Sequence, residues 1–151
     1  MYEWCSKYVG IPFVSGGRDK SGCDCYGLVR LILHNEYNTE LPLLIGDYTN
    51  ALCIQETKEL FTQNIPILCT DKIEQPEEKA VALMKMRGRL CHVGLYAGDG
   101  YIIHSRHNLG AVCERLSSPQ HLHRIRHLVQ PRQQQKKKPQ RRYPMRSKPQ
   151  K

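Results

Sequence analysis

The sequence predicts an α+β fold in which helices come first and a largely antiparallel sheet follows. Early in the chain, apolar side chains recur at the three- and four-residue spacing of a buried helix face. After Pro66 they gather instead in short runs typical of strands. Two of these runs flank Gly98-Asp99-Gly100, a segment typical of a β-hairpin turn. A chain of 151 residues is long enough for one domain with one hydrophobic core.

Three helices are expected in the first half of the chain. A short helix over residues 2–9 ends at Gly10, which favours a helix C-terminus. The main helix covers residues 26–37, and helical spacing places four apolar side chains on one buried face: Leu28, Val29, Leu31 and Ile32. A third helix is expected over residues 50–62, after an irregular segment.

The expected strands all lie in the second half of the chain. They are residues 80–84, 91–97, 101–105, 110–116 and 122–129. Because the second and third of them are joined by the Gly98-Asp99-Gly100 turn, we expect them to pair antiparallel as a hairpin.

The net charge of +9 is concentrated at the C-terminus. Residues 131–151 contain nine Lys or Arg and no Asp or Glu, whereas residues 1–130 contain 14 basic and 14 acidic side chains. The sequence therefore predicts a neutral folded domain over residues 1–130 and a disordered basic tail over residues 131–151. Such a tail can bind nucleic acid or other anionic polymers, dock an assembly partner, or only increase solubility. Its single aromatic residue, Tyr143, gives little support for base stacking.

No apolar run approaches the length of a membrane span, and the first residues do not resemble a signal peptide. We therefore expect synthesis in the cytoplasm. Seven cysteines without a secretory signal are expected to be mostly reduced, buried thiols.

Cys25 is the strongest candidate for a catalytic residue. It follows a tight turn at Gly22 and lies at the start of the main predicted helix. Unpaired backbone N–H groups and the positive end of the helix dipole favour an ionised thiol there, and the thiolate is the nucleophile. Asp24, directly before it, is expected to cap the helix or bind loop N–H groups.

A catalytic thiol needs a base, which is usually a histidine, and the base needs an orienting group. His92 and His104 lie on either side of the hairpin turn. A three-residue loop that pairs Ala97 with Tyr101 places both rings on one face of the hairpin. A two-residue turn places them on opposite faces unless a β-bulge resets the register. The catalytic hypothesis therefore predicts a three-residue loop or a bulge.

A zinc site is the alternative interpretation of some of these residues. Cys23 and Cys25 form a Cys-x-Cys pair, and Cys91-His92 lies downstream. Structural zinc sites favour Cys pairs spaced by two to four residues together with a second such pair, which this sequence lacks. We therefore expect no metal ion and no organic cofactor.

Taken together, these motifs resemble the NlpC-type cysteine peptidases, which are papain-like hydrolases that cut the peptide stems of bacterial peptidoglycan. The similarity covers about residues 4–129. It is carried by Pro12-Phe13, Gly16-Gly17, Gly22-Cys23-Asp24-Cys25-Tyr26-Gly27-Leu28-Val29, His92-Val93-Gly94-Leu95-Tyr96-Ala97-Gly98-Asp99-Gly100 and Ile103-His104. Three further segments look most like the phage tail-associated branch: Cys25-Tyr26-Gly27-Leu28-Val29-Arg30, Glu40-Leu41-Pro42 and Gly46-Asp47-Tyr48.

The resemblance implies a role for each matching residue. Cys25 corresponds to the nucleophile, His92 to the general base and His104 to the third residue, which orients the base. The oxyanion and substrate cleft is expected to include Phe13, Asp24 and Tyr26. Family members usually have Tyr where this chain has Phe13, which cannot donate a hydrogen bond to an oxyanion, and cellular members often have Ser where it has Tyr26.

The resemblance also implies a function and its setting. The expected reaction is hydrolysis of a peptidoglycan stem amide, between D-glutamate and a diamino acid, through a thiol acyl-enzyme. The expected partners are peptidoglycan and other phage tail proteins, and the expected place of action is a virion tail at the cell wall. A structural tail component with little catalysis is the alternative, which the loss of the tyrosine hydroxyl favours. A third possibility is a nucleic-acid-binding protein that depends on the basic tail.

Overall fold

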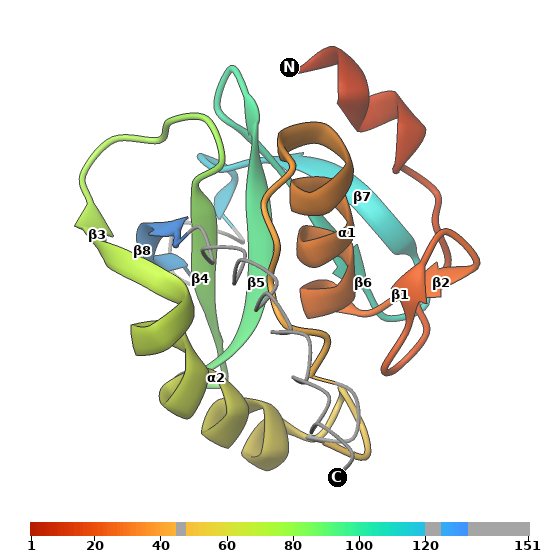
Figure 1. Cartoon of the computed structure of the whole chain (residues 1–151), viewed down its shortest axis with the longest axis vertical. Coiled ribbons are helices and arrows are strands. Elements are labelled where there is room, and N and C mark those ends of the chain that lie inside the picture. Colours follow the sequence, from red (N-terminus) through yellow and green to blue (C-terminus); the bar gives the residue numbers. More distant parts are fainter. Residues whose placement is uncertain (45–47, 120–124, 133–151) are drawn as a thin grey trace, which may run out of the picture.

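The computed structural model describes residues 1–44, 48–119 and 125–132, and it has the expected α+β architecture (Figure 1). The first half contains the 3-10 helix η1 (Glu3–Lys7), a small hairpin of β1 (Arg18–Asp19) and β2 (Gly22–Cys23), and the helices α1 (Cys25–Tyr37) and α2 (Ile54–Leu68). The strands of the main sheet are β3 (Cys69–Ile73), β4 (Val81–Met86), β5 (Arg89–Gly98), β6 (Tyr101–Arg106), β7 (Gly110–Arg115) and β8 (Ile125–Pro131).

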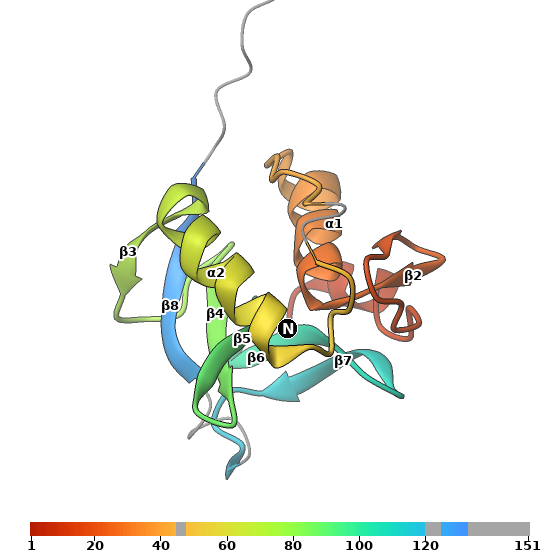
Figure 2. The same cartoon turned by 90° about the horizontal axis from the view of Figure 1, so that it is seen from below.

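The main sheet has the strand order β3-β8-β4-β5-β6-β7, and every neighbouring pair is antiparallel. Both helices lie on the same side of this sheet, which curves beneath them (Figure 2). The core contains buried side chains of α1 together with those of the central strands, among them Leu28, Ile32, Leu33, Val93, Leu95 and Ile103. The expected packing of N-terminal helices on an antiparallel sheet is therefore confirmed. Neither helix in the described part of the chain is long and apolar enough to cross a membrane.

Helix α1 begins and ends where local sequence signals place it. The Asp24 carboxylate accepts a hydrogen bond of 2.8 Å from the Gly27 N–H, which makes Asp24 the N-cap. The helix ends at Asn38, whose backbone is left-handed with φ of 49°. One residue of the expected buried face differs, because Leu31 is only half-buried and Leu33 is fully buried in its place.

Helix α2 differs from the expected helix over residues 50–62, because it starts later and runs on to Leu68. Asn50 forms a turn before the helix, in which its side-chain oxygen accepts a hydrogen bond from a following backbone N–H. Glu56, in the first turn, accepts a hydrogen bond of 3.2 Å from the Asn50 N–H. Pro66 lies inside the helix, two residues before its end, and it has no N–H with which to form a helical hydrogen bond.

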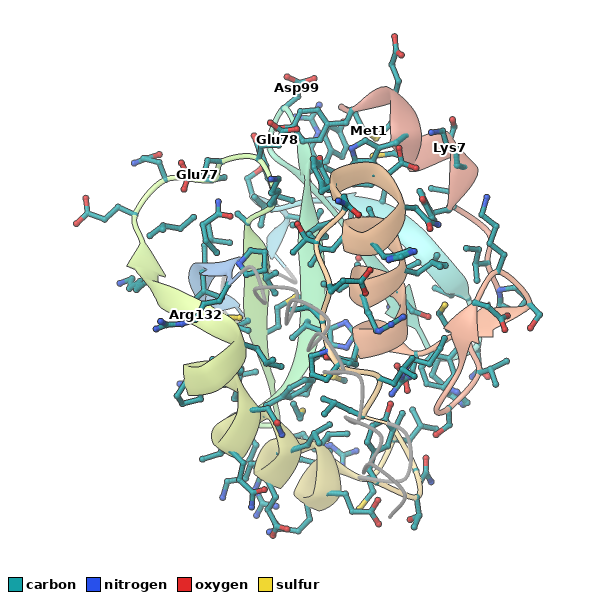
Figure 3. All side chains as sticks on the ribbon, in the orientation of Figure 1. Met1, Lys7, Glu77, Glu78, Asp99 and Arg132 are labelled. Carbon is teal, nitrogen blue, oxygen red and sulfur yellow. The ribbon has the colours of Figure 1, made fainter. Side chains whose placement is uncertain are left out.

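Strand β3 was not expected, and its pairing with β8 extends the folded part of the chain. Pro131 pairs with Cys69. Arg132 donates hydrogen bonds of 2.7 Å to the Cys69 carbonyl through its side chain and of 2.7 Å to the Leu68 carbonyl through its backbone. Figure 3 shows the Arg132 side chain beside β3. The folded part therefore reaches Arg132. The rest of the predicted basic tail, residues 133–151, and the start of the last predicted strand lie outside the described residues.

All seven cysteines are free thiols. Outside the Cys23–Cys25 segment, Cys5, Cys69 and Cys91 are buried, as expected, whereas Cys53 and Cys113 are half-buried.

Candidate active site

The three residues expected to carry out catalysis line one cavity of about 380 Å³. Cys25 comes from the start of α1, His92 from β5 and His104 from β6. Other walls are formed by the residues around the start of α2 and by the β4–β5 hairpin, including Leu52, Ile54, Met86 and Arg87. The fold therefore gathers segments from both halves of the chain around the candidate thiol.

The two histidines contact each other because the β5–β6 hairpin contains a bulge. Gly98 pairs with Tyr101 across a two-residue turn, and the register shifts between Tyr96 and Gly98. This is the bulge that the catalytic hypothesis predicted as one of its two possibilities. It brings both rings to one face, where His92 Nε2 lies 2.8 Å from His104 Nδ1. The ring planes are inclined by 74°.

Gly94 leaves room for this contact. A Cβ atom at Gly94 would lie 3.2 Å from the His104 Cβ and 3.2 Å from the end of the Met84 side chain. Because both neighbours are buried, neither can move away freely. The glycine therefore allows the ring of His104 to reach across to the neighbouring strand.

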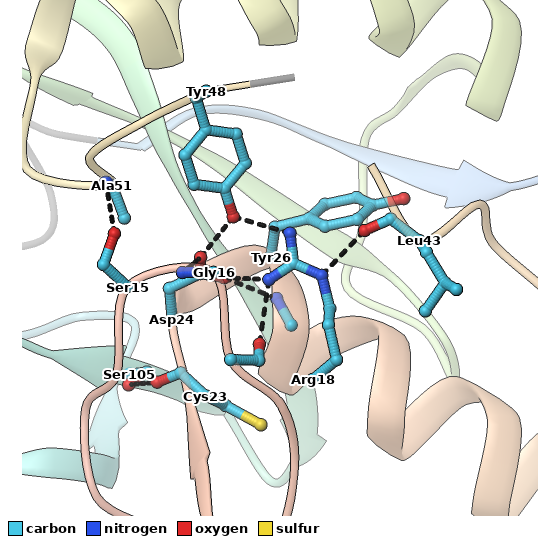
Figure 4. Close-up of polar contacts among 12 residues, drawn as sticks. Ser15, Gly16, Arg18, Cys23, Asp24, Tyr26, Leu43, Tyr48, Ala51 and Ser105 are labelled. Atoms are coloured by element: carbon cyan, nitrogen blue, oxygen red, sulfur yellow. Dashed lines mark hydrogen bonds and ion pairs between the residues drawn. The ribbon is translucent and has the colours of Figure 1, made fainter. Parts of the chain in front are cut away.

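A single buried hydrogen bond connects the segment before the candidate nucleophile to the strand that carries His104. The Ser105 hydroxyl donates to the Cys23 carbonyl at 2.8 Å (Figure 4). Cys23 lies two residues before Cys25, and Ser105 directly follows His104. The bond therefore helps to fix the position of the start of α1 relative to β6.

Asp24 holds the loop before α1 rather than lining the cavity. Its buried carboxylate accepts hydrogen bonds of 2.8 Å from the N–H groups of Gly16 and Gly27 and one from the Tyr48 hydroxyl, and it pairs with Arg18 at 3.0 Å (Figure 4). The Asp24 side chain is 1% exposed and the Arg18 side chain 7%. Asp24 therefore does not line the cavity, where the substrate cleft was expected to include it. Its capping contact with Gly27 is as expected.

The side chain of Tyr26 also lies outside the cavity in which it was expected. Its hydroxyl donates a hydrogen bond of 2.8 Å to the Pro42 carbonyl, on another side of α1. Only its backbone N–H faces the sulfur of Cys25. Phe13 does line the cavity, and its ring packs edge-on against the ring of His107, with the centroids 5.5 Å apart. His107, which was expected at the surface, is exposed and also lines the cavity.

The environment of Cys25 raises the pKa of its thiol, whereas its position at a helix N-terminus led us to expect a lowered one. Burial, and after it the negative charge of Asp24, raise the pKa of Cys25 to about 12. Hydrogen bonds from the backbone N–H groups of Val93 and Tyr26 lower this pKa but do not offset the burial. A base must therefore remove the proton before or during any attack by this sulfur.

Of the residues of the alternative zinc site, Cys25, Cys91 and His92 line the cavity, whereas Cys23 does not. The Cys23 thiol donates to the Asp19 carbonyl at 3.0 Å. In residues 1–44, 48–119 and 125–132, no three His, Cys, Asp or Glu side chains gather in an arrangement that could hold a metal ion.

Sequence reasoning missed Glu114, on β7. Its Oε2 atom lies 2.8 Å from His104 Nε2, and its Oε1 atom accepts a hydrogen bond of 2.8 Å from Arg106. The β6–β7 register pairs His104 with Val112, which places Glu114 diagonally next to His104 on the same face. The alternation of the predicted strands contained this signal, but the register between them had to be known to use it.

Comparisons with known proteins show the family and the fold of this chain. The model of the NlpC/P60 family matches residues 10–143. The solved NlpC/p60 domain of the peptidoglycan hydrolase SagA is 20% identical, with a TM-score of 0.54 over 83% of this chain and 91% of that domain. An NlpC/P60 family protein from Bacillus cereus is 20% identical, with a TM-score of 0.58 over 82% of this chain but only 36% of that longer protein.

The eukaryotic protein NlpC1 from Trichomonas vaginalis has the same fold, with 15% identity and a TM-score of 0.54 over 85% of this chain and 40% of that protein. No curated protein gives a significant match. The structural neighbours show the expected papain-like α+β fold, and the family model covers most of the chain. The chain therefore belongs to the NlpC/P60 family.

Proposed function

We propose that this protein is a cysteine peptidase that hydrolyses an amide bond in the stem peptides of bacterial peptidoglycan. The observation that carries the proposal is the shared cavity, in which the Cys25 thiol and the bonded pair of His92 and His104 come together. Family membership supports it, and the structural neighbour SagA is itself described as a peptidoglycan hydrolase.

In the first step, His92 takes the proton of Cys25 as the sulfur attacks the scissile carbonyl carbon. His104 orients the ring of His92 through their 2.8 Å contact. The protonated His92 then gives the proton to the leaving amine, the C–N bond breaks, and a thioester remains on Cys25. The raised pKa of this thiol favours proton transfer to His92 during the attack.

In the second step, water attacks the thioester with His92 again acting as the base, which releases the acid product and the thiol. The negative charge on the carbonyl oxygen needs hydrogen-bond donors in both steps. The first N–H groups of a helix have no partner within the helix, so the backbone N–H of Cys25 is the expected donor. Phe13 lines the cavity but offers no hydroxyl to help.

The finer assignments rest on the motifs alone. We propose that the cleaved bond joins D-glutamate to a diamino acid, such as meso-diaminopimelate. We also propose that the protein is made in the bacterial cytoplasm and acts on the cell wall from a phage tail. The segments that support the tail setting are residues 25–30, 40–42 and 46–48, of which residues 46 and 47 lie outside the described part.

The proposal is tested by measuring the amino groups released from purified peptidoglycan and identifying the fragments by mass. Wild type is expected to release them, and Cys25→Ala is expected to release none while retaining its melting temperature. Cys53→Ala is the matched control, because it removes a thiol that does not line the cavity. Full release by Cys25→Ala, or none by wild type on any peptidoglycan type, would contradict the proposal.

A structural component of a phage tail is the second candidate function. Two observations favour it: Phe13 replaces an oxyanion donor of the family, and the environment of Cys25 favours the neutral thiol. This candidate predicts stable association with other tail proteins that is unchanged by Cys25→Ala, together with no release of amino groups.

A further inference from the structure

The chain of contacts that starts at His92, here called the relay, continues beyond His104. His104 Nε2 lies 2.8 Å from Glu114 Oε2, and Arg106 donates to the other carboxylate oxygen at 2.8 Å. The His104 ring is 4% exposed and the Glu114 side chain 19%. The Arg106 guanidinium donates to Glu114 and favours the ionised carboxylate, which can only accept hydrogen bonds.

The positions of the protons follow from this acceptor. His104 Nε2 must carry a hydrogen, because the Glu114 carboxylate cannot donate one. A neutral imidazole has a single N–H, so His104 Nδ1 is an acceptor. The atom 2.8 Å away, His92 Nε2, must then be the donor. A neutral His92 ring with its hydrogen on Nε2 has its basic lone pair on Nδ1.

We propose that Glu114 is a positioning residue that sets the tautomers of His104 and His92, so that His92 Nδ1 is the atom that takes the proton of the thiol. This inference rests on the proposed function, and it extends the relay by one residue. When His92 becomes positively charged during the reaction, the negative charge of Glu114 also stabilises it through His104.

The opposite arrangement is available to the same two rings. If His104 carries its hydrogen on Nδ1, it donates to His92 Nε2, and the single hydrogen of His92 must lie on Nδ1. That nitrogen can then no longer accept a proton. The two arrangements have the same number of hydrogen bonds between the rings, and the ionised carboxylate favours the first because it needs a donor at His104 Nε2.

Glu114→Gln tests this choice with little change in shape. Arg106 can only donate, so it holds the amide oxygen, and the amide NH₂ group then faces His104 Nε2. His104 Nε2 then becomes an acceptor, and the direction of the hydrogen bond between the two histidine rings is reversed. In the Ser-His-Asp triad described for other hydrolases, the change from Asp to Asn gives the wrong tautomer and lowers kcat by about 10⁴-fold. We expect kcat/KM to fall by on the order of 10²-fold or more here, because Glu114 acts through one further ring.

The direct measurement is two-dimensional ¹H–¹⁵N NMR of the histidine side chains in the protein without substrate. Wild type is expected to show both His92 and His104 with the hydrogen on Nε2. Glu114→Gln is expected to move the ring hydrogen to Nδ1 in both histidines. Adding Arg106→Met leaves the amide free to turn, and this double variant is expected to restore part of the Nε2 form.

Glu40→Gln is the matched control, because Glu40 also contacts a histidine ring, that of His34 at 2.6 Å, but does not line the cavity. It should change neither the tautomers of the active-site rings nor the activity. Nδ1 tautomers in wild type, or unchanged tautomers in Glu114→Gln, would overturn the inference. The NMR result does not depend on the substrate, so a failure to cut peptidoglycan would refute the proposed function separately.

Discussion

Replacing Arg18 with Met should destabilise the loop that presents Cys25, because Arg18 balances a buried negative charge. The guanidinium group pairs with Asp24 at 3.0 Å and donates to the carbonyl of Leu43 at 2.7 Å and to the hydroxyl of Tyr48 at 2.6 Å. Methionine keeps much of the apolar stem of Arg18 but none of these contacts. The change leaves the carboxylate buried without its counter-ion.

Removing one partner of a buried ion pair costs about 3–5 kcal/mol of folding free energy. Asp24 keeps its hydrogen bonds from Gly16, Gly27 and Tyr48, so we expect a loss near the lower limit, about 3 kcal/mol. For a protein of this size, that corresponds to a decrease in melting temperature of roughly 6–12 °C. The uncompensated charge of Asp24 should also raise the pKa of Cys25 further and reduce activity.

The assay is urea unfolding of Arg18→Met, Asp24→Asn and the double variant. The double variant removes both charges, so its loss should be smaller than the sum of the two single losses. Arg89→Met is the control, because Arg89 is exposed and its removal should change stability by less than about 0.5 kcal/mol. A loss below about 1 kcal/mol for Arg18→Met, or simple additivity in the double variant, would refute the reasoning.

Three further changes test the cavity and its surroundings. Phe13→Tyr should raise kcat, by up to about 10²-fold, if a missing oxyanion donor limits the reaction, and an unchanged kcat would show that the site does not use this position. Gly94→Ala should place a methyl group 3.2 Å from the His104 Cβ and lower the free energy of unfolding by about 1–3 kcal/mol through overpacking. It should also lower kcat/KM of the folded enzyme, and a wild-type kcat/KM would contradict this. The free energy of unfolding should fall as the pH rises from 9 towards 12, because the Cys25 thiol ionises at a lower pH in the unfolded chain than in the folded protein. Urea unfolding of Cys25→Ser should show a smaller fall over the same pH range.

The sequence predicted helix α1 well because its signals are local. Asp24 supplies the cap and Asn38 accommodates the left-handed end, and each acts within a few residues of its own position. The bounds of α2 were predicted wrongly because the local signals at Asn50 and Pro66 do not mark the ends of this helix. Asn50 forms a turn before the helix, whose N-cap is Cys53, and Pro66 lies in its last turn, directly before β3.

From the sequence, His92 and His104 could be predicted to share a face only if the hairpin had a particular kind of turn. The sequence showed that a bulge or a longer loop was needed, but the Gly98-Asp99-Gly100 segment fits either turn. The structure chooses the two-residue turn with a bulge. The glycines of this segment are compatible with both kinds of turn, so the choice between the two turns depends on packing over the whole hairpin.

The surroundings of Cys25 show the limit of reasoning from sequence neighbours. Asp24 and Tyr26 flank the thiol in the chain, but helix geometry turns both side chains away from the cavity. Glu114, nearly ninety residues away, contacts His104 instead, because the antiparallel register of β6 and β7 places it there. Since side chains alternate between the faces of a strand, a shift of one residue in β7 would remove the carboxylate from this face and leave most backbone pairing intact. The chemistry of the site therefore depends on strand register more strictly than the fold does.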